Sequence, residues 1–380
     1  MLGALKSHHN GLHLKTALGF LLLTAGIGSG CGEANPPVAA APPPSAAASN
    51  APTTVTPIAT QTAAKPTPQA AAHPAFDSEK AFALLKKQCD FGPRVLGTEA
   101  HEKTKAFLVE EMKKYADTTL EQTFTYRNLT GTNIIGVFNP AGATLPASQP
   151  VLLLTHWDAR PIADGPNSSE TRRGIVFRYG PNGWKPTAPI SAACDGASGV
   201  AVLLELARLF HEKKPAAGVV LLLDDAEDYG DFNANDFTGE GVELGAKYFS
   251  EHYKELKAVG TPAYGILLDM VGGKGAFFPR EQYSQQNAQM VNDKVYGIAQ
   301  ALGYSRQFRS NETQDVGDDH IWLNKAGIPT IDLIHPLPLG DYAAKGYAYW
   351  HTTQDTPDKC SPQSLKVIGD VVAEVIYREP

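Results

Sequence analysis

The chain has little cysteine and no excess of basic residues. Its 380 residues contain 33 lysines and arginines against 40 aspartates and glutamates, which gives a formal net charge of −7. Because the sequence has no basic stripe, we expect no nucleic-acid partner. The total of 4 cysteines shows no spacing typical of a zinc knuckle. The hydrophobic residues, 43% of the chain, are enough to build a real core.

The sequence also has no apolar run near its N-terminus that is long enough to span a bilayer comfortably. Residues 16–27 form a short apolar run, and small residues follow it up to Cys31. Residues 1–31 therefore resemble a bacterial lipoprotein signal, although Gly28 stands where a leucine is expected. This resemblance implies an exported protein of the bacterial cell envelope, attached to a membrane only through a lipid at Cys31. Ordinary cleavage or an uncleaved anchor is the alternative.

Two further segments follow the signal. Residues 32–75 consist mainly of Ala, Pro, Thr, Ser and Gln, so they cannot bury enough apolar surface to fold and are expected to form a disordered linker. Residues 76–380 are expected to form one large catalytic domain. This domain contains Cys89, Cys194 and Cys360, and the sequence does not decide which of them pair.

Apolar runs alternate with amphipathic segments along the domain, which predicts an α/β fold. The connections between the later strands are long enough for right-handed crossovers, which favours parallel pairing. We therefore expect an open, mixed, mostly parallel central sheet with helices on both faces. The expected strands are 118–126, 133–138, 151–155, 219–224, 265–270 and 329–334, and the expected helices are 77–88, 98–115, 196–211, 287–302 and 362–377.

Three of the expected strands end in polar residues. One such cluster alone could be a solvated acidic turn, but parallel sheets place ligands beyond the carboxyl ends of their strands. Three polar strand ends at one edge indicate a cation site. The residues concerned are His156 and Asp158, then Asp224, Asp225, Glu227 and Asp228, and finally Asp269.

Histidine nitrogen and carboxylate oxygen are ligands that zinc prefers, and a catalytic zinc keeps one position open. The candidates are His156, Asp195, Asp228, Asp269 and His351. Each has a simpler interpretation. Asp195 could cap the helix that follows, His156 could be a hydrogen-bonded core residue, and Asp269 could accept from a backbone amide. His351 could lie on a surface loop.

The order of these residues resembles that of metallopeptidase family 28. The pattern is His156-x-Asp158, Asp195-Gly-Ala-Ser-Gly, Ala226-Glu-Asp-x-Gly230, Leu268-Asp-Met270 and His351-Thr. This family contains zinc aminopeptidases and a branch of glutaminyl-peptide cyclotransferases. The resemblance implies an α/β/α sandwich like that of the zinc aminopeptidases.

The resemblance also implies roles for individual residues. Asp195, Asp228 and His351 would bind one zinc ion, and Glu227 would be the general acid/base. His156 and Asp269 would complete a possible second metal site. From the residues themselves we expect Asp158 to orient His156. Asp224 and Asp225 are expected in a solvated or hydrogen-bonded turn.

Other residues favour the cyclotransferase branch. By resemblance, Asp318 would act with Asp269 on the reacting amide, and Trp350 would lie against the substrate; His320 and Phe278 are further candidate substrate contacts. The alternatives are that Asp318 caps a helix and that Trp350 only packs on its loop. Two departures, Cys194 in place of a common Asn and a longer loop 162–189, leave substrate preference open.

The resemblance thus implies a zinc-dependent glutaminyl-peptide cyclotransferase. Such an enzyme converts the N-terminal glutamine of peptides or proteins to pyroglutamate and releases ammonia. One zinc is expected and a second is possible. A zinc aminopeptidase of the same family is the alternative, and a non-catalytic surface-binding lipoprotein is a remote one.

Overall fold

The computed structural model describes residues 72–168, 190–230 and 241–380. The predicted signal, nearly all of the predicted linker and most of loop 162–189 lie outside these ranges. The described residues all belong to one compact unit, Lys65–Pro380. The end of the predicted linker contacts the fold, because His73 stacks on Tyr377 with 4.9 Å between ring centroids.

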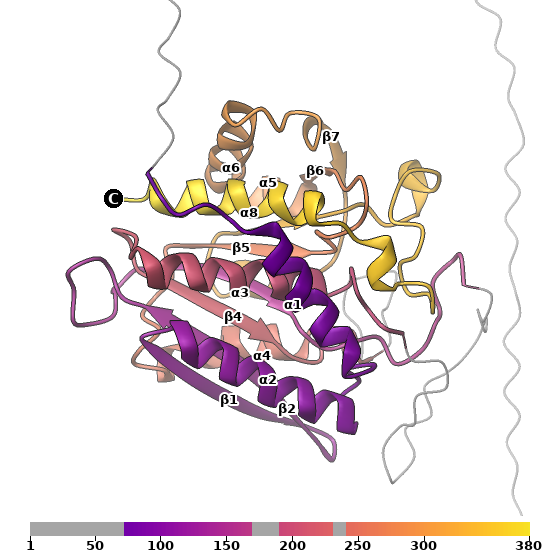
Figure 1. Ribbon diagram of the computed structural model, residues 1–380, viewed down its shortest axis with the longest axis horizontal. Helices are drawn as coiled ribbons and strands as arrows, with labels where there is room; N and C mark the ends of the chain where they lie inside the picture. Colours follow the sequence, from indigo (N-terminus) through magenta and orange to yellow (C-terminus); the bar gives the residue numbers. More distant parts are fainter. Residues whose placement is uncertain (1–71, 169–189, 231–240) are drawn as a thin grey trace, which may run out of the picture. The chain divides into compact units, whose positions relative to one another are not determined.

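A six-stranded sheet forms the centre of this unit (Figure 1), in the order β1-β2-β4-β3-β5-β8. The strands are β1 (Thr118–Tyr126), β2 (Leu129–Phe138), β3 (Val151–His156), β4 (Val219–Asp224), β5 (Tyr264–Asp269) and β8 (Thr330–Ile334). β1, β2 and β4 pair antiparallel, whereas β4–β3, β3–β5 and β5–β8 pair in parallel. The predicted mixed, mostly parallel sheet is confirmed.

The central strands form because their apolar side chains are buried on both faces of the sheet. Every residue of β3, β4 and β5 is buried. Neighbouring side chains point to opposite faces, so Leu153 and Leu221 pack in one hydrophobic cluster while Leu152 and Val220 pack in the other. Continuous apolar runs of this kind are typical of parallel strands that are covered on both sides.

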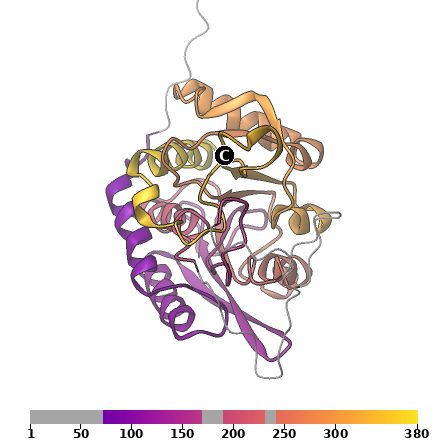
Figure 2. The same ribbon diagram turned by 90° about the vertical axis from the view of Figure 1, so that its right-hand side faces the viewer.

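Helices cover both faces of the sheet. The helices α1 (Ser78–Asp90), α2 (Glu99–Tyr115), α3 (Ala197–Glu212), α6 (Gln289–Ala301) and α8 (Pro362–Tyr377) contribute to the larger hydrophobic cluster, and α4 (Leu244–His252) and α7 (His320–Lys325) to the other. Figure 2 shows the indigo helices α1 and α2 together on one side of the strands. Asp77 caps α1 and Ser361 caps α8, as their sequences indicate.

Several short elements were not predicted. β6 (Phe278–Glu281) and β7 (Phe308–Gln314) form a separate two-stranded parallel sheet. Most of β7 is only partly buried or exposed, so its sequence lacks the apolar run that marks a buried strand. The other unpredicted elements are α4, α5 (Gln282–Asn287), η1 (Tyr253–Glu255), η2 (Gly340–Tyr342) and η3 (Pro357–Lys359), whereas α7 is the helix expected directly after Asp318. Among the described residues, no helix combines the length and apolar character needed to cross a membrane.

The sheet register brings the polar strand ends together. His156, the last residue of β3, pairs with Asp224, the last residue of β4. Asp269 ends β5 in the same direction, because β5 runs parallel to β3. The carboxyl ends of three neighbouring strands therefore open onto one region of the molecule.

Candidate metal centre

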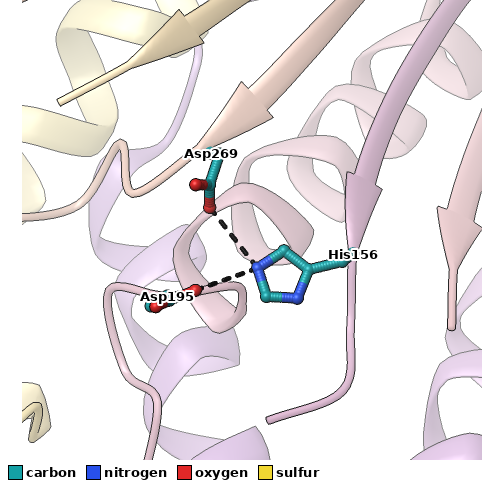
Figure 3. A group of neighbouring side chains, drawn as sticks. All are labelled: His156, Asp195 and Asp269. Atoms are coloured by element: carbon teal, nitrogen blue, oxygen red, sulfur yellow. Dashed lines mark ion pairs between the residues drawn. The ribbon is translucent and has the colours of Figure 1, made fainter. Parts of the chain in front are cut away.

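Two groups of donor atoms share Asp195 at this edge of the sheet. Within each group the donor atoms lie within 4.8 Å of one another. In the first, His156 Nε2 lies 3.1 Å from Asp195 Oδ1 and 3.4 Å from Asp269 Oδ1 (Figure 3). In the second, His351 Nε2 lies 3.1 Å from Asp228 Oδ1 and 3.5 Å from Asp195 Oδ2. The five residues proposed from the sequence thus lie together.

Asp195 lies two residues before the start of helix α3 but does not cap it. The N-cap residue is Gly196, and no side chain makes a capping hydrogen bond there. A Cβ atom at Gly196 would lie 2.4 Å from the carbonyl oxygen of His156 and 2.6 Å from its Nε2 atom. Only glycine permits this close approach, which leaves the Asp195 carboxylate beside the imidazole of His156.

Asp355 holds the backbone around Asp195. Its carboxylate accepts hydrogen bonds from the N–H groups of Cys194 (2.9 Å) and Asp195 (3.2 Å) and from the hydroxyl of Tyr347 (2.6 Å). Burial and the nearby Asp195 carboxylate raise the pKa of Asp355 to about 7. No sequence pattern marks Asp355 for this role, because it lies far from Asp195 in the chain and meets it only in the folded structure.

Asp158 holds the opposite side of the centre. Its two carboxylate oxygens accept from the backbone N–H groups of Glu227 (3.1 Å) and Asp228 (3.2 Å). The expected contact with His156 is also present, at 3.3 Å from Nδ1. A carboxylate in this position fixes which imidazole nitrogen faces a metal.

The donor set fits a divalent cation. The ligand candidates are all buried, and both side-chain oxygens of Asp228, together with Oδ2 of Asp195 and Oδ1 of Asp269, make no hydrogen bond of good geometry within the described residues. Burial and the neighbouring Asp228 raise the pKa of Asp195 to about 6. Buried carboxylates that repel one another and make no hydrogen bond of good geometry are stabilised by a metal ion, and histidine with carboxylate ligands suits zinc.

Glu227 stands beside this set but belongs to neither group of donor atoms. It is buried, and its Oε2 atom lies 3.7 Å from His156 Nδ1. Burial and the charge of Asp228 raise the pKa of Glu227 well above its ordinary value. A carboxyl group with a raised pKa next to a metal centre is suited to accept and return a proton.

A pocket with a volume of about 280 Å³ opens onto the centre. It is lined by Asp195, Asp228, His351, Glu227, Asp269, Asp315, Gly317, Asp318 and Trp350, with apolar walls from Val316, Ile334, Leu337 and Leu339. The Trp350 ring stacks on His351, with 4.0 Å between centroids. This contact places the tryptophan ring beside a ligand candidate in the wall of the pocket.

Asp318 is a buried carboxyl group in the wall of this pocket. Its pKa is raised well above the ordinary value by burial and by the neighbouring Asp269. Asp318 Oδ1 accepts from the N–H of Asp319 at 2.6 Å. The N-cap of α7 is Asp319, which makes no side-chain capping bond. Asp318 therefore does not have the simple helix-capping role that was its alternative.

Two expected substrate contacts do not line the pocket. His320 and Phe278 are fully buried, and His320 Nε2 lies 3.0 Å from Glu281 Oε2. Phe278 packs on Phe308 with 5.4 Å between centroids. Both lie behind the surface that a substrate would reach, because β6 and α7 pack against neighbouring elements rather than opening onto the pocket.

The turn after β4 is not solvated. Asp224 and Asp225 are both fully buried, and Asp225 accepts from the N–H of Thr132 at 2.7 Å and lies 2.9 Å from His101 Nε2. The hydrogen-bonded alternative thus holds for Asp225. All of the cysteines within the described residues, Cys89, Cys194 and Cys360, are free thiols.

The fold and the site together define a metal-dependent α/β enzyme whose centre lies at the carboxyl ends of parallel strands. Residues 133–376 match Peptidase family M28, and the chain belongs to this family. Its predicted membership of metallopeptidase family 28 is therefore confirmed.

Solved structures of both branches resemble the chain. The glutaminyl cyclase of Bacteroides thetaiotaomicron shares 34% identity with a TM-score of 0.68, covering 81% of this chain and 100% of that one. A leucine aminopeptidase precursor from the same organism shares 34% identity with a TM-score of 0.67, covering 82% and 100%. Aminopeptidase YwaD of Bacillus subtilis is 23% identical over 256 residues, which span 66% of this chain but only 45% of that protein.

Proposed function

We propose that the protein is a zinc-dependent glutaminyl-peptide cyclotransferase, an acyltransferase that acts on peptides or proteins with N-terminal glutamine. The observation that carries the proposal is one pocket in which the metal ligands, Glu227, buried Asp318 and Trp350 meet. Similarity to the Bacteroides thetaiotaomicron glutaminyl cyclase over its whole length supports the same activity.

Asp195, Asp228 and His351 would hold the zinc ion. When bound there, zinc supplies Lewis-acid polarisation of the γ-carbonyl group of the substrate glutamine. His156 and Asp269 form the other group of donor atoms together with Asp195. A possible second ion would bind to this group. One zinc is enough for the proposed reaction.

The chain's own residues handle the protons and the geometry. Glu227 accepts a proton from the α-amine of the substrate as this amine attacks the γ-carbon, and returns it to the departing ammonia. Asp318 and Asp269 accept hydrogen bonds from the amide nitrogen. Trp350 covers the glutamine side chain and excludes water, so that the internal amine is the nucleophile.

The aminopeptidase alternative uses the same ligands with water as nucleophile, and a leucine aminopeptidase precursor is also a structural neighbour. Two peptides that differ only in their first residue distinguish the activities. The proposal predicts that the Gln-initiated peptide loses ammonia, about 17 mass units, by internal attack at the polarised carbonyl, while the Leu-initiated peptide stays whole. Removal of leucine without any cyclisation would establish the peptidase instead.

We also propose that the protein is exported and anchored in the bacterial cell envelope through a lipid on Cys31. The short apolar run and small residues before Cys31 support this proposal. Wild-type protein should partition into the detergent phase, whereas Cys31→Ser should stay in the aqueous phase. An unmodified mature N-terminus at another residue, found by mass spectrometry, would contradict it.

A further inference from the structure

His351 is a ligand candidate that lies in a loop, so no helix or strand fixes the direction of its side chain. Its backbone has φ 51°, a conformation that non-glycine residues seldom adopt. Neither a helix nor a strand includes it. Its imidazole must nevertheless present Nε2 toward Asp228 and Asp195, so other side chains have to fix its orientation.

Asp164, in the described part of the long loop after β3, faces the other ring nitrogen. Asp164 Oδ1 lies 3.3 Å from His351 Nδ1. The two segments also join through their backbones, because the N–H of Gly165 donates to the carbonyl of His351 at 2.9 Å. A Cβ atom at Gly165 would lie 2.1 Å from the carbonyl oxygen of Trp350. Glycine is therefore required for this close approach.

Arg160 holds Asp164 in turn. Its Nε and Nη2 atoms donate to the two carboxylate oxygens at 3.2 and 2.6 Å. The Arg160 guanidinium is buried, and its Nη1 donates to the carbonyl oxygens of Asp228 (3.0 Å) and Gly230 (2.6 Å). Arg160 therefore connects the backbone of Asp228 to the Asp164 carboxylate, which in turn contacts His351.

We propose that Asp164 and Arg160 are positioning residues of the metal centre. Asp164 accepts the Nδ1 proton of His351, which leaves the Nε2 lone pair directed at the metal and makes the imidazole a stronger donor. Arg160 neutralises Asp164 and fixes its two oxygens through a bidentate contact. The inference rests on the zinc centre that the proposed function requires. It holds whether that centre catalyses cyclisation or peptide hydrolysis.

The test measures zinc affinity directly, by competition with a chromophoric chelator. Asp164→Asn should weaken zinc binding roughly 10- to 100-fold, the usual effect of losing a carboxylate partner of a ligating histidine. Asp164→Glu keeps the carboxylate and should restore part of the affinity. Exposed Asp341 supplies the matched control, since Asp341→Asn should bind zinc as the wild type does.

Nitrogen NMR of the zinc-loaded wild type reports which ring nitrogen of His351 carries the proton, a property that a purely structural role of Asp164 would not determine. The proton should be on Nδ1. In the affinity measurement, Arg160→Met should weaken zinc binding, as Asp164→Asn does. Unchanged affinity in Asp164→Asn, or a His351 ring protonated at Nε2, would overturn the inference. If zinc affinity falls in the Asp164 and Arg160 variants as expected but the wild type does not cyclise glutamine, the proposed function is refuted and this inference stands.

Discussion

Glu227 combines a buried carboxyl group with a position beside the metal ligands. Because burial and Asp228 raise its pKa, it can hold a proton during turnover. Glu227→Gln keeps the shape but cannot exchange that proton, so cyclisation should slow by roughly 100-fold or more. Steady-state rates on a Gln-initiated peptide, with zinc content measured in parallel, check this. Exposed Glu251 gives the control, Glu251→Gln, and near-normal turnover in Glu227→Gln would remove its assigned role.

Asp318 has a role in the proposed cyclase pocket that is separate from metal binding. It lines the pocket but belongs to neither group of donor atoms. Asp318→Ala should therefore retain zinc while losing most cyclisation, roughly 100-fold, because the amide nitrogen of the substrate loses its acceptor. Zinc analysis and ammonia release together make the measurement. If the variant cyclises glutamine at the wild-type rate, Asp318 has no part in the reaction.

The ligand candidates could be identified from the sequence because each lies at a strand end or in a short motif. Of the supporting residues, Asp158 could be identified as well, because it lies two residues after His156, whereas the more distant ones could not. Asp355 and Asp164 reach Asp195 and His351 across the fold, and nothing in their own neighbourhoods marks them. Their roles depend on contacts between loops, which local sequence patterns do not encode.

At the scale of elements, Arg94 joins two loops that flank the centre. Its guanidinium is fully buried and donates to the carbonyls of Trp157 (2.8 Å), Asp158 (3.3 Å), Ser191 (2.9 Å) and Ala192 (2.8 Å). Arg94→Met would leave these carbonyls without their charged donor. The free energy of unfolding should fall by roughly 3 kcal/mol, as expected for losing buried bonds to a charged group.

Denaturant titration of the zinc-loaded protein measures this loss. Lys86→Met is a suitable control, because Lys86 is an exposed residue of α1, and its stability should change little. Equal stability of Arg94→Met and wild type would show that the two loops are held by other contacts.

Long apolar runs made the central elements predictable. β3, β4 and β5 lie within a residue or so of their expected ranges, because continuous burial leaves a clear pattern. The loops after them were not predictable in detail. Ala192, Ala226 and Met270 in these loops, and His351 in the loop after β8, all have positive φ, which costs roughly 1–3 kcal/mol each and is stabilised only by surrounding structure.

For the whole molecule, Glu243 links stability to pH. Burial raises its pKa from 4.5 to about 7, although the Trp322 indole donates to it. The folded state therefore favours the protonated form. Its contribution to stability is fully present below the ordinary pKa and is lost as pH rises through about 7.

Glu243→Gln isolates this contribution, because glutamine does not titrate and can still accept from Trp322. The free energy of unfolding of wild type relative to the variant should fall by roughly 3 kcal/mol between about pH 4.5 and pH 7, given about 1.4 kcal/mol for each pKa unit. Unfolding titrations of both proteins at several pH values measure it. A difference that stays constant across this range would contradict the raised pKa.

The central claim is that an internal amine, and not water, attacks a carbonyl group in the pocket beside Asp195, Asp228 and His351. Mass spectrometry of the reaction in water enriched in heavy oxygen tests this most directly. A Gln-initiated peptide should lose about 17 mass units and gain no label, because ring closure expels ammonia without hydrolysis. Heavy oxygen in a newly formed carboxyl group, on the released amino acid or on the glutamine side chain, would contradict the account.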